Sequence, residues 1–442
     1  MGLKYIEQVK SVVLVLLILL SFSLTFAIWT YSPVIQPNEG TTVDISIAEK
    51  KKMEDIIKPY RMVVSQEDGL KGSFASQPIE FVFDNMKNWE IQTVDLASNK
   101  LTTDQVNEFI TKPNRASFFF AADVPVEVLA TSLNFTDQIF PEAYFNRLII
   151  DWNEDNPDNM IMYFISTSQQ KMYTASAKKV NKLGFVDRIL KHADKMQVYN
   201  EIIIENKLSL YASSVPENIQ SYTYSIKDIE IEKFKDALFN NPSLVRSNPV
   251  SLNEQQFTDD SALMKVNFNS KTLNYVHPAS ENDNPGKSVD LIQNSLNFVN
   301  EHNGWTDDYR YFRMNTNDRH INYQLYFADL PVFSKDILTE VSQRWGVDRV
   351  YKYIRPLYTL TGAVPFKTRE VQLASGQSVY DFLSTATDIN TSGIDDIVIA
   401  YYLSRDETEP HFNLEPSWYY LESGSWIRIS PELLGGTKYG LE

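Results

Sequence analysis

An uncharged run near the start of the chain, residues 11–31, constrains the protein more than any other stretch. It reads SVVLVLLILLSFSLTFAIWTY and contains no Asp, Glu, Lys or Arg. An α-helix of this length reaches across the roughly 30 Å hydrocarbon core of a bilayer. A helix also satisfies its own backbone polar groups, which lipid cannot do. The run therefore predicts a single transmembrane helix, with most of the chain on one side of a membrane.

The flanking charges predict the orientation of this helix. Lys4 and Lys10 precede the run, whereas Glu39 and Asp44 follow it. Because basic residues stay on the cytoplasmic side, the N-terminus is expected inside the cell and the bulk of the chain outside. We therefore predict a cell-membrane protein with a cytoplasmic N-terminus.

The C-terminal end of the run favours an uncleaved signal anchor over a cleaved signal peptide. A cleavable signal has a shorter apolar core and small residues at its cleavage site. Here the exit is bulky, with Ile28, Trp29 and Tyr31. We predict that Trp29 and Tyr31 lie at the membrane interface, where both residue types are enriched.

One face of the predicted helix is a candidate contact with a partner helix. Ser21 and Thr25 are four residues apart and share a face, which Leu14, Ile18 and Ile28 extend. Small and hydroxyl side chains let membrane helices approach closely and hydrogen-bond to each other. In a passive anchor the same hydroxyls bond to their own helix backbone. The residues alone leave both interpretations open.

Composition bounds the rest of the chain. With 43% hydrophobic and 13% aromatic residues among 442, it predicts packed globular structure over more than one domain. The net charge of −16 argues against nucleic acid as a partner. The absence of cysteine excludes disulfides and thiolate sites, and in an outward-facing protein it favours a Gram-positive bacterium.

Helical and extended patterns alternate along the chain, which predicts an α+β fold. Helices are expected at residues 102–110, 177–193, 228–240, 289–299 and 378–385, a strand at 79–83, and a hairpin at 198–212. We predict a cytoplasmic tail (1–10), a transmembrane helix (11–31), a stalk (32–43) and three outer α+β domains (44–221, 222–345, 346–442). The last two domains have a similar order of elements and are predicted to be related.

No stretch of the sequence carries a motif for catalysis or for a cofactor. The histidines lack zinc-binding spacing, and neither a nucleophile elbow nor a phosphate-binding glycine loop occurs. Residues 151–158 (DWNEDNPD) resemble a calcium loop, but Asn156 and Met162 stand where glycine and glutamate are needed. We therefore predict no catalytic residue, no cofactor and no metal site.

Two features leave an alternative function open. Adjacent carboxylates occur at Asp259–Asp260, Asp307–Asp308 and Asp395–Asp396, as expected by chance in an acidic chain. Aromatic residues are dense near the C-terminus, at Tyr401, Tyr402, Trp418, Tyr419, Tyr420 and Trp426. Core packing explains such residues most simply, whereas exposed rings would suit carbohydrate or protein binding. The alternative is a protein that binds or hydrolyses the cell wall.

The exit of the apolar run supports a resemblance to a known family. Residues 21–33 read SFSLTFAIWTYSP, and residues 415–420 read EPSWYY. With a cysteine-free outer region of this length, the chain resembles the YycH family of Gram-positive bacteria.

The resemblance implies a regulatory function and no catalytic motif. YycH proteins are accessory regulators of the sensor histidine kinase WalK (YycG), which works with WalR, and they act with the membrane protein YycI. The family fold is three extracytoplasmic α+β domains, and its signalling is attributed largely to contacts between transmembrane helices. The partners expected are thus WalK, YycI and the membrane, with a homodimer as a further option.

Overall fold

Strands dominate the part of the chain that the computed structural model describes. These residues are 14, 17–18, 20–22 and 48–430, except 138, 154–155, 157, 282–285, 365–366, 387–388 and 407–410. The chain divides into two units, residues 1–44 and 45–442. In the first unit the six described residues are helical. Among all described residues, no helix combines the length and the apolar character needed to span a bilayer.

Within the described part of the second unit, the first sheet has ten strands in the order β10-β9-β2-β1-β5-β6-β7-β8-β3, with β4 also beside β8. The strands are β1 (Arg61–Gln66), β2 (Gly69–Ser73), β3 (Glu90–Ile91), β4 (Asp95–Ser98), β5 (Arg115–Pro125), β6 (Tyr144–Asp151), β7 (Met160–Ser166), β8 (Lys171–Lys178), β9 (Gln197–Ile202) and β10 (Leu210–Ser213). The helices in this region are α2 (Met53–Ile56), α3 (Ser76–Met86), α4 (Thr103–Thr111), α5 (Val126–Leu129) and α6 (Lys182–Ala193).

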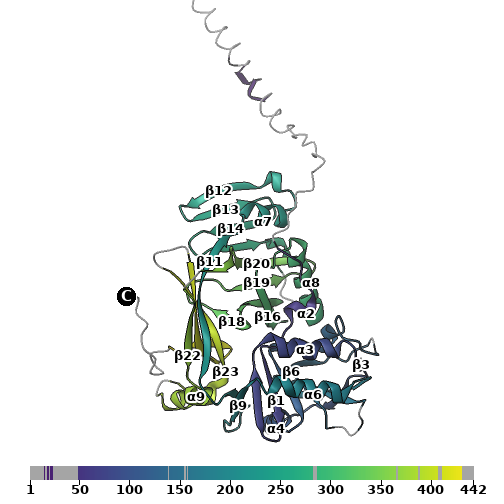
Figure 1. The fold of residues 1–442 in the computed structure, drawn as a ribbon. Coiled ribbons are helices and arrows are strands. Elements are labelled where there is room, and N and C mark those ends of the chain that lie inside the picture. Colours follow the sequence, from purple (N-terminus) through teal and green to yellow (C-terminus); the bar gives the residue numbers. More distant parts are fainter. Residues whose placement is uncertain are drawn as a thin grey trace, which may run out of the picture. The chain divides into compact units, whose positions relative to one another are not determined.

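Both faces of the first sheet are buried. Alternate residues of a strand point to opposite faces. On β5, Phe118 and Phe120 belong to the large apolar core that includes residues of α3 and α6, while Phe119 belongs to a second cluster with residues of α4. Helices therefore cover both faces of the sheet (Figure 1), which explains why residues 61–65 of β1 and 115–120 of β5 are buried without alternation.

The second sheet has 15 strands within the described residues, running from β12 through β15, β20, β19, β17, β18, β23 and β24 to β11 and β21. Its strands are β11 (Glu217–Asp228), β12 (Arg246–Ser251), β13 (Glu254–Thr258), β14 (Leu263–Asn267), β15 (Thr272–Val276), β16 (Asp308–Asn315), β17 (His320–Phe327), β18 (Leu330–Phe333), β19 (Glu340–Trp345), β20 (Val350–Pro356), β21 (Tyr358–Ala363), β22 (Arg369–Leu373), β23 (Ile394–Arg405), β24 (His411–Glu422) and β25 (Ser425–Arg428). With it lie α7 (Ile231–Leu238), α8 (Ser288–Glu301), α9 (Gly376–Thr385) and the short 3-10 helices η1 (Pro242–Leu244), η2 (Pro278–Ser280) and η3 (Thr391–Gly393).

The α+β class is confirmed, and the predicted helices are found as α4, α6, α7, α8 and α9. The predicted hairpin is confirmed as the antiparallel pair β9–β10. The division into three outer domains, and the relation between the last two, stay predictions.

The strand predicted at residues 79–83 is wrong, because this segment lies inside helix α3. Its buried residues Ile79, Val82 and Met86 recur at three- and four-residue intervals, which is the helical period. The run of Ile, Phe and Val resembles a strand in composition, but the packing of one face against the sheet selects the helix.

Candidate functional site

The predicted partner-helix face lies only partly among the described residues. Leu14, Ile18 and Ser21 are helical and exposed, with Leu14 59% and Ile18 47% accessible. Thr25, Ile28, Trp29 and Tyr31 lie outside the described residues. The helix face and the interface residues therefore stay predictions.

A short segment at the start of the second unit joins its two sheets. We call residues 48–58, which include α2, the clasp. At its beginning the clasp bonds to the end of α8, where the Ala48 amide donates to the Asn303 carbonyl over 2.6 Å. The Lys51 amide donates to Asn300 Oδ1 over 2.9 Å, and Asn300 Nδ2 donates back to the Lys51 carbonyl over 2.8 Å. The clasp is thus held first by residues next to the second sheet.

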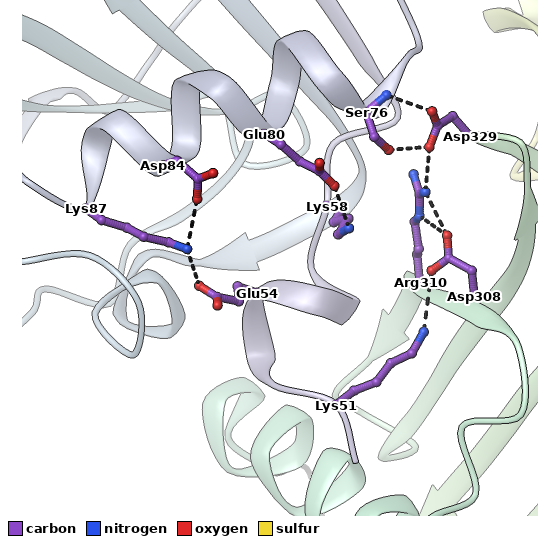
Figure 2. A network of polar contacts seen from close by, with 10 residues as sticks. All are labelled: Lys51, Glu54, Lys58, Ser76, Glu80, Asp84, Lys87, Asp308, Arg310 and Asp329. Atoms are coloured by element: carbon purple, nitrogen blue, oxygen red, sulfur yellow. Dashed lines mark hydrogen bonds and ion pairs between the residues drawn. The ribbon is translucent and has the colours of Figure 1, made fainter. Parts of the chain in front are cut away.

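The clasp is also tied to helix α3 beside the first sheet (Figure 2). Glu54 forms an ion pair with Lys87 at 3.1 Å, and Lys58 forms one with Glu80 at 3.2 Å. These side chains are partly exposed, so each pair contributes little stability by itself. Together they define the position of the clasp beside α3.

On the other side, the ammonium of Lys51 reaches the start of β16. Its Nζ donates to the Asp307 carbonyl over 3.1 Å and lies 3.4 Å from Asp308 Oδ1. Burial lowers the pKa of Lys51 from its ordinary value, while the Asp308 carboxylate opposes that shift. A partly buried cation therefore links the clasp to the second sheet.

Arg310 of β16 lies at the centre of the network in Figure 2. Its side chain is 4% exposed, and its Nη2 lies 2.7 Å from Asp308 Oδ2 and 3.0 Å from Asp329 Oδ1. Asp329 in turn accepts the Ser76 amide over 2.8 Å and the Ser76 hydroxyl. Burial alone would raise the pKa of Asp329, but the bonds from Ser76 and Arg310 lower it below the ordinary value.

Asp329, next to β18 of the second sheet, therefore caps helix α3 beside the first sheet. Ser76 is the first residue of α3, and Ala75 before it provides no side-chain cap. A carboxylate at this place satisfies a free amide and complements the positive end of the helix dipole. A residue from the turn between β17 and β18 thus stabilises the first turn of α3.

That turn has an unusual backbone. Ala328 and Asp329 both have positive φ, of 45° and 66°, between the paired residues Phe327 and Leu330. Two such residues in a two-residue hairpin form a type I′ turn, where asparagine and glycine are preferred. Alanine in this conformation is strained by about 1–2 kcal/mol. The surrounding contacts of Asp329 hold the turn in place.

A cavity of about 210 Å³ opens between α2, α3 and α5. Apolar side chains form most of its wall, including Met53, Ile79, Phe83 and Leu129, with Arg310 among the lining residues. The volume lies below the roughly 300–1,000 Å³ of typical small-ligand sites. Residues of the clasp, of α3 and of β16 all line this cavity, so it lies where the regions of the two sheets meet.

A buried ion pair joins the two sheets at a second place. Arg61 Nη1 of β1 donates to Asp396 Oδ1 of β23 over 3.0 Å, and the two side chains are only 5% and 8% exposed. Asp396 also accepts the Tyr60 hydroxyl and, over 2.8 Å, the Ile397 amide. Burial, followed by the Asp396 charge, raises the pKa of Tyr60. Arg61 Nη2 also donates to the Ile397 carbonyl, so both charges have further hydrogen-bonding partners, as buried charges require.

At least one member of each adjacent carboxylate pair lies at a structural contact. Asp308 and Asp396 belong to the two links described above, and Asp395 pairs with Lys207 of the first-sheet region at 2.9 Å. Asp259 accepts backbone bonds in the turn between β13 and β14. The contacts of Asp308, Asp395 and Asp396 join residues that are far apart in the sequence, so no local pattern predicts them.

The other candidate residues also find structural places. Asp151, which opens the calcium-like string, pairs with Arg115 at 2.7 Å. Among the described residues, no group of histidines or carboxylates could hold a metal ion. The prediction that the C-terminal aromatic residues pack in the core is confirmed for Tyr401, Trp418, Tyr419 and Tyr420, which are at most 7% exposed, while Tyr402 and Trp426 are half-buried.

Comparison with known proteins identifies the family. The N-terminal domain of YycH proteins matches residues 7–197, and the C-terminal domain of YycH proteins matches residues 207–434. The two-component system WalR/WalK regulatory protein YycH of Bacillus subtilis (strain 168) is 23% identical over 456 residues, which cover 99% of each chain. The crystal structure of YycH from Bacillus subtilis has the same fold, with a TM-score of 0.74 at 20% identity, over 88% of this chain and 99% of that one. With both family domains matched along nearly its whole length, the chain belongs to the YycH family.

Proposed function

We propose that this chain is a membrane-anchored regulator of the WalR/WalK two-component system. In this proposal it acts on the sensor kinase WalK (YycG), together with YycI, and is not itself an enzyme. The observation that carries the proposal is the end-to-end match to the Bacillus subtilis WalR/WalK regulatory protein. The chain would cross the cell membrane once at residues 11–31, with its N-terminus in the cytoplasm.

A regulator can shift a two-state kinase only by binding its two states with different affinity. We assign that difference to the helix face of Leu14, Ile18, Ser21, Thr25 and Ile28, packed against membrane helices of the kinase. The serine and threonine hydroxyls and the small side chains favour close helix contact in lipid. Trp29 and Tyr31 would hold the helix at its depth in the membrane.

The clasp supports a role for the outer region in the same process. It is the first described segment after residue 22, and it bonds to α8, β16 and α3. A change in the relation between the two sheets would therefore alter the clasp. Through the clasp, the state of the outer region would reach the predicted membrane helix.

The experiment is to replace Ser21 and Thr25 together with leucine and to measure WalK autophosphorylation in vesicles containing the kinase, YycI and the full chain. Leucine keeps the helix apolar but removes both hydroxyls. The expected result is a loss of the regulatory effect with normal insertion. Unchanged kinase output from a correctly inserted protein would refute the assigned face.

A matched variant distinguishes the face from general damage to the helix. Leu16 and Leu20 are not three, four or seven residues from any member of the assigned face, so they lie outside it in the predicted helix. Replacing both with isoleucine should leave kinase output unchanged. Replacing residues 11–31 with an unrelated membrane helix should abolish regulation, whereas a protein that needs only tethering would keep its activity.

A further inference from the structure

A second cavity, of about 370 Å³, lies at one end of the second sheet. It opens between the ends of α7 and β15, one face of α8, and the turns β13–β14 and β19–β20. Its volume falls within the roughly 300–1,000 Å³ of small-molecule sites. None of the contacts between the two sheets described above uses its lining residues.

The cavity wall is rich in side chains that donate or accept hydrogen bonds. Asn294, Asn297 and Glu301 come from successive turns of α8, at the spacing that places them on one helix face. Asn240 lies opposite, just after α7. Side-chain amides offer two donors and one acceptor oxygen each, which suits ligand hydroxyl groups.

Tyr275 shows that the cavity has unused hydrogen-bonding capacity. The residue is 5% exposed and lines the cavity, but its hydroxyl makes no hydrogen bond with any described residue. Burial, followed by the nearby Asp259 charge, raises the pKa of Tyr275 to about 12. The ring is buried, but the hydroxyl oxygen is not enclosed by the chain, so a ligand in the cavity can bond to it.

The apolar and charged groups of the cavity narrow the class of ligand. Aromatic rings are present as Phe239, Phe298 and Trp345, which provide apolar surface beside the polar groups. Three carboxylates line the cavity, from Asp259, Glu301 and Asp348, against the single guanidinium of Arg349. This excess of negative charge disfavours anions.

We propose that this cavity binds a small, neutral or cationic, hydroxyl-rich ligand of the saccharide class. Amides, the Tyr275 phenol and the carboxylates bond to its hydroxyl or ammonium groups, and the aromatic residues contact its CH surfaces. The inference does not depend on the regulatory role, because binding is a property of this chain alone.

The test measures binding of three probes to the full chain by saturation-transfer NMR and calorimetry. The probes are N-acetylglucosamine, which is neutral, glucosamine, which is cationic, and glucuronic acid, which is anionic. Any detergent must lack a sugar headgroup. The expected result is saturable binding of one or both of the first two probes at millimolar concentration, and weaker binding of glucuronic acid.

Two variants link that binding to the cavity. Tyr275→Phe removes one hydroxyl and should weaken the affinity about five- to tenfold, the effect of one lost hydrogen bond. Asn294→Trp, at an exposed position on α8, fills the opening without disturbing the core and should abolish binding. Tyr380→Phe, on α9 outside the cavity, is the matched control and should bind as the unmodified chain does.

Three results would overturn the proposal. One is the absence of saturable binding for all three probes, and another is a preference for glucuronic acid. The third is equal affinity of the unmodified chain and the Asn294→Trp variant, whose exposed site keeps the test valid even if Tyr275→Phe fails to fold.

Discussion

The ion pair between Arg61 and Asp396 offers the sharpest test of how the two sheets are held together. Asp396→Asn keeps the size of the side chain but removes its charge. The guanidinium of Arg61, with 5% of its side chain exposed, would then lie buried without an opposite charge. Tyr60 and the Ile397 amide would also lose a charged acceptor.

The magnitude follows from the burial of the pair. Removing one partner of a buried, hydrogen-bonded ion pair costs about 3–5 kcal/mol, because the remaining charge is uncompensated. Asparagine still offers one acceptor oxygen, so we expect a loss of about 3 kcal/mol in the free energy of unfolding for Asp396→Asn. Arg61→Met leaves the carboxylate with its Tyr60 and Ile397 donors, and we expect a similar loss.

The assay is urea unfolding of the full chain and its variants, followed by both tryptophan fluorescence and circular dichroism. The double variant Arg61→Met/Asp396→Asn contains neither buried charge. Its loss should be smaller than the sum of the two single losses by about 2 kcal/mol or more. The segment 214–216 between β10 and β11 should become more sensitive to protease in the single variants, since the sheets separate more readily.

Additive losses in the double variant would refute the reasoning, because they would mean that the two charges do not stabilise each other. A matched pair on the surface provides the control. Lys191 and Asp187 on α6 pair at 2.7 Å but are 69% and 61% exposed, so Asp187→Asn should change stability by less than about 1 kcal/mol.

Two further predictions concern the second sheet. Burial raises the pKa of Asp307 to about 6 from 3.8, so the folded state binds a proton more readily than the unfolded state and stability falls as pH rises between these values. Asp307→Asn should therefore raise the free energy of unfolding at pH 7.5 by up to roughly 3 kcal/mol, with no gain at pH 4, and an equal effect at both pH values in urea unfolding would contradict this. Ala328→Gly relieves the positive φ of the type I′ turn and should stabilise the chain by about 0.5–1 kcal/mol in thermal unfolding, whereas a loss would show that alanine is not strained there.

The helices that the sequence predicted are mostly those whose start signals are local. Thr102 caps α4 by accepting the Gln105 amide, and Ser375 caps α9 by accepting the Ser378 amide. Residues 79–83 of helix α3 are predicted as a strand from their composition, and the first amide of this helix bonds to Asp329, which lies 253 residues further along the chain. A signal supplied from so far away cannot be read in a local window.

The same limit applies to the candidate site. The sequence distinguishes Asp308 and Asp396 only as members of adjacent carboxylate pairs, because nothing near them in sequence indicates their partners. Arg61 lies 335 residues from Asp396, and Lys51 lies 257 residues from Asp308. Composition predicts a chain with a buried core and many charged residues. Which charged residues pair with each other depends on the arrangement of the two sheets.

The order of bonds along the clasp has a mechanical consequence. Although residues 48–58 precede the first sheet in sequence, their earliest contacts, at Ala48 and Lys51, are with Asn303 and Asn300 beside the second sheet. Tension on the N-terminal end of the clasp would therefore act first on α8, beside the second sheet. The first sheet would bear this load only after the bonds from Ala48 and Lys51 had broken.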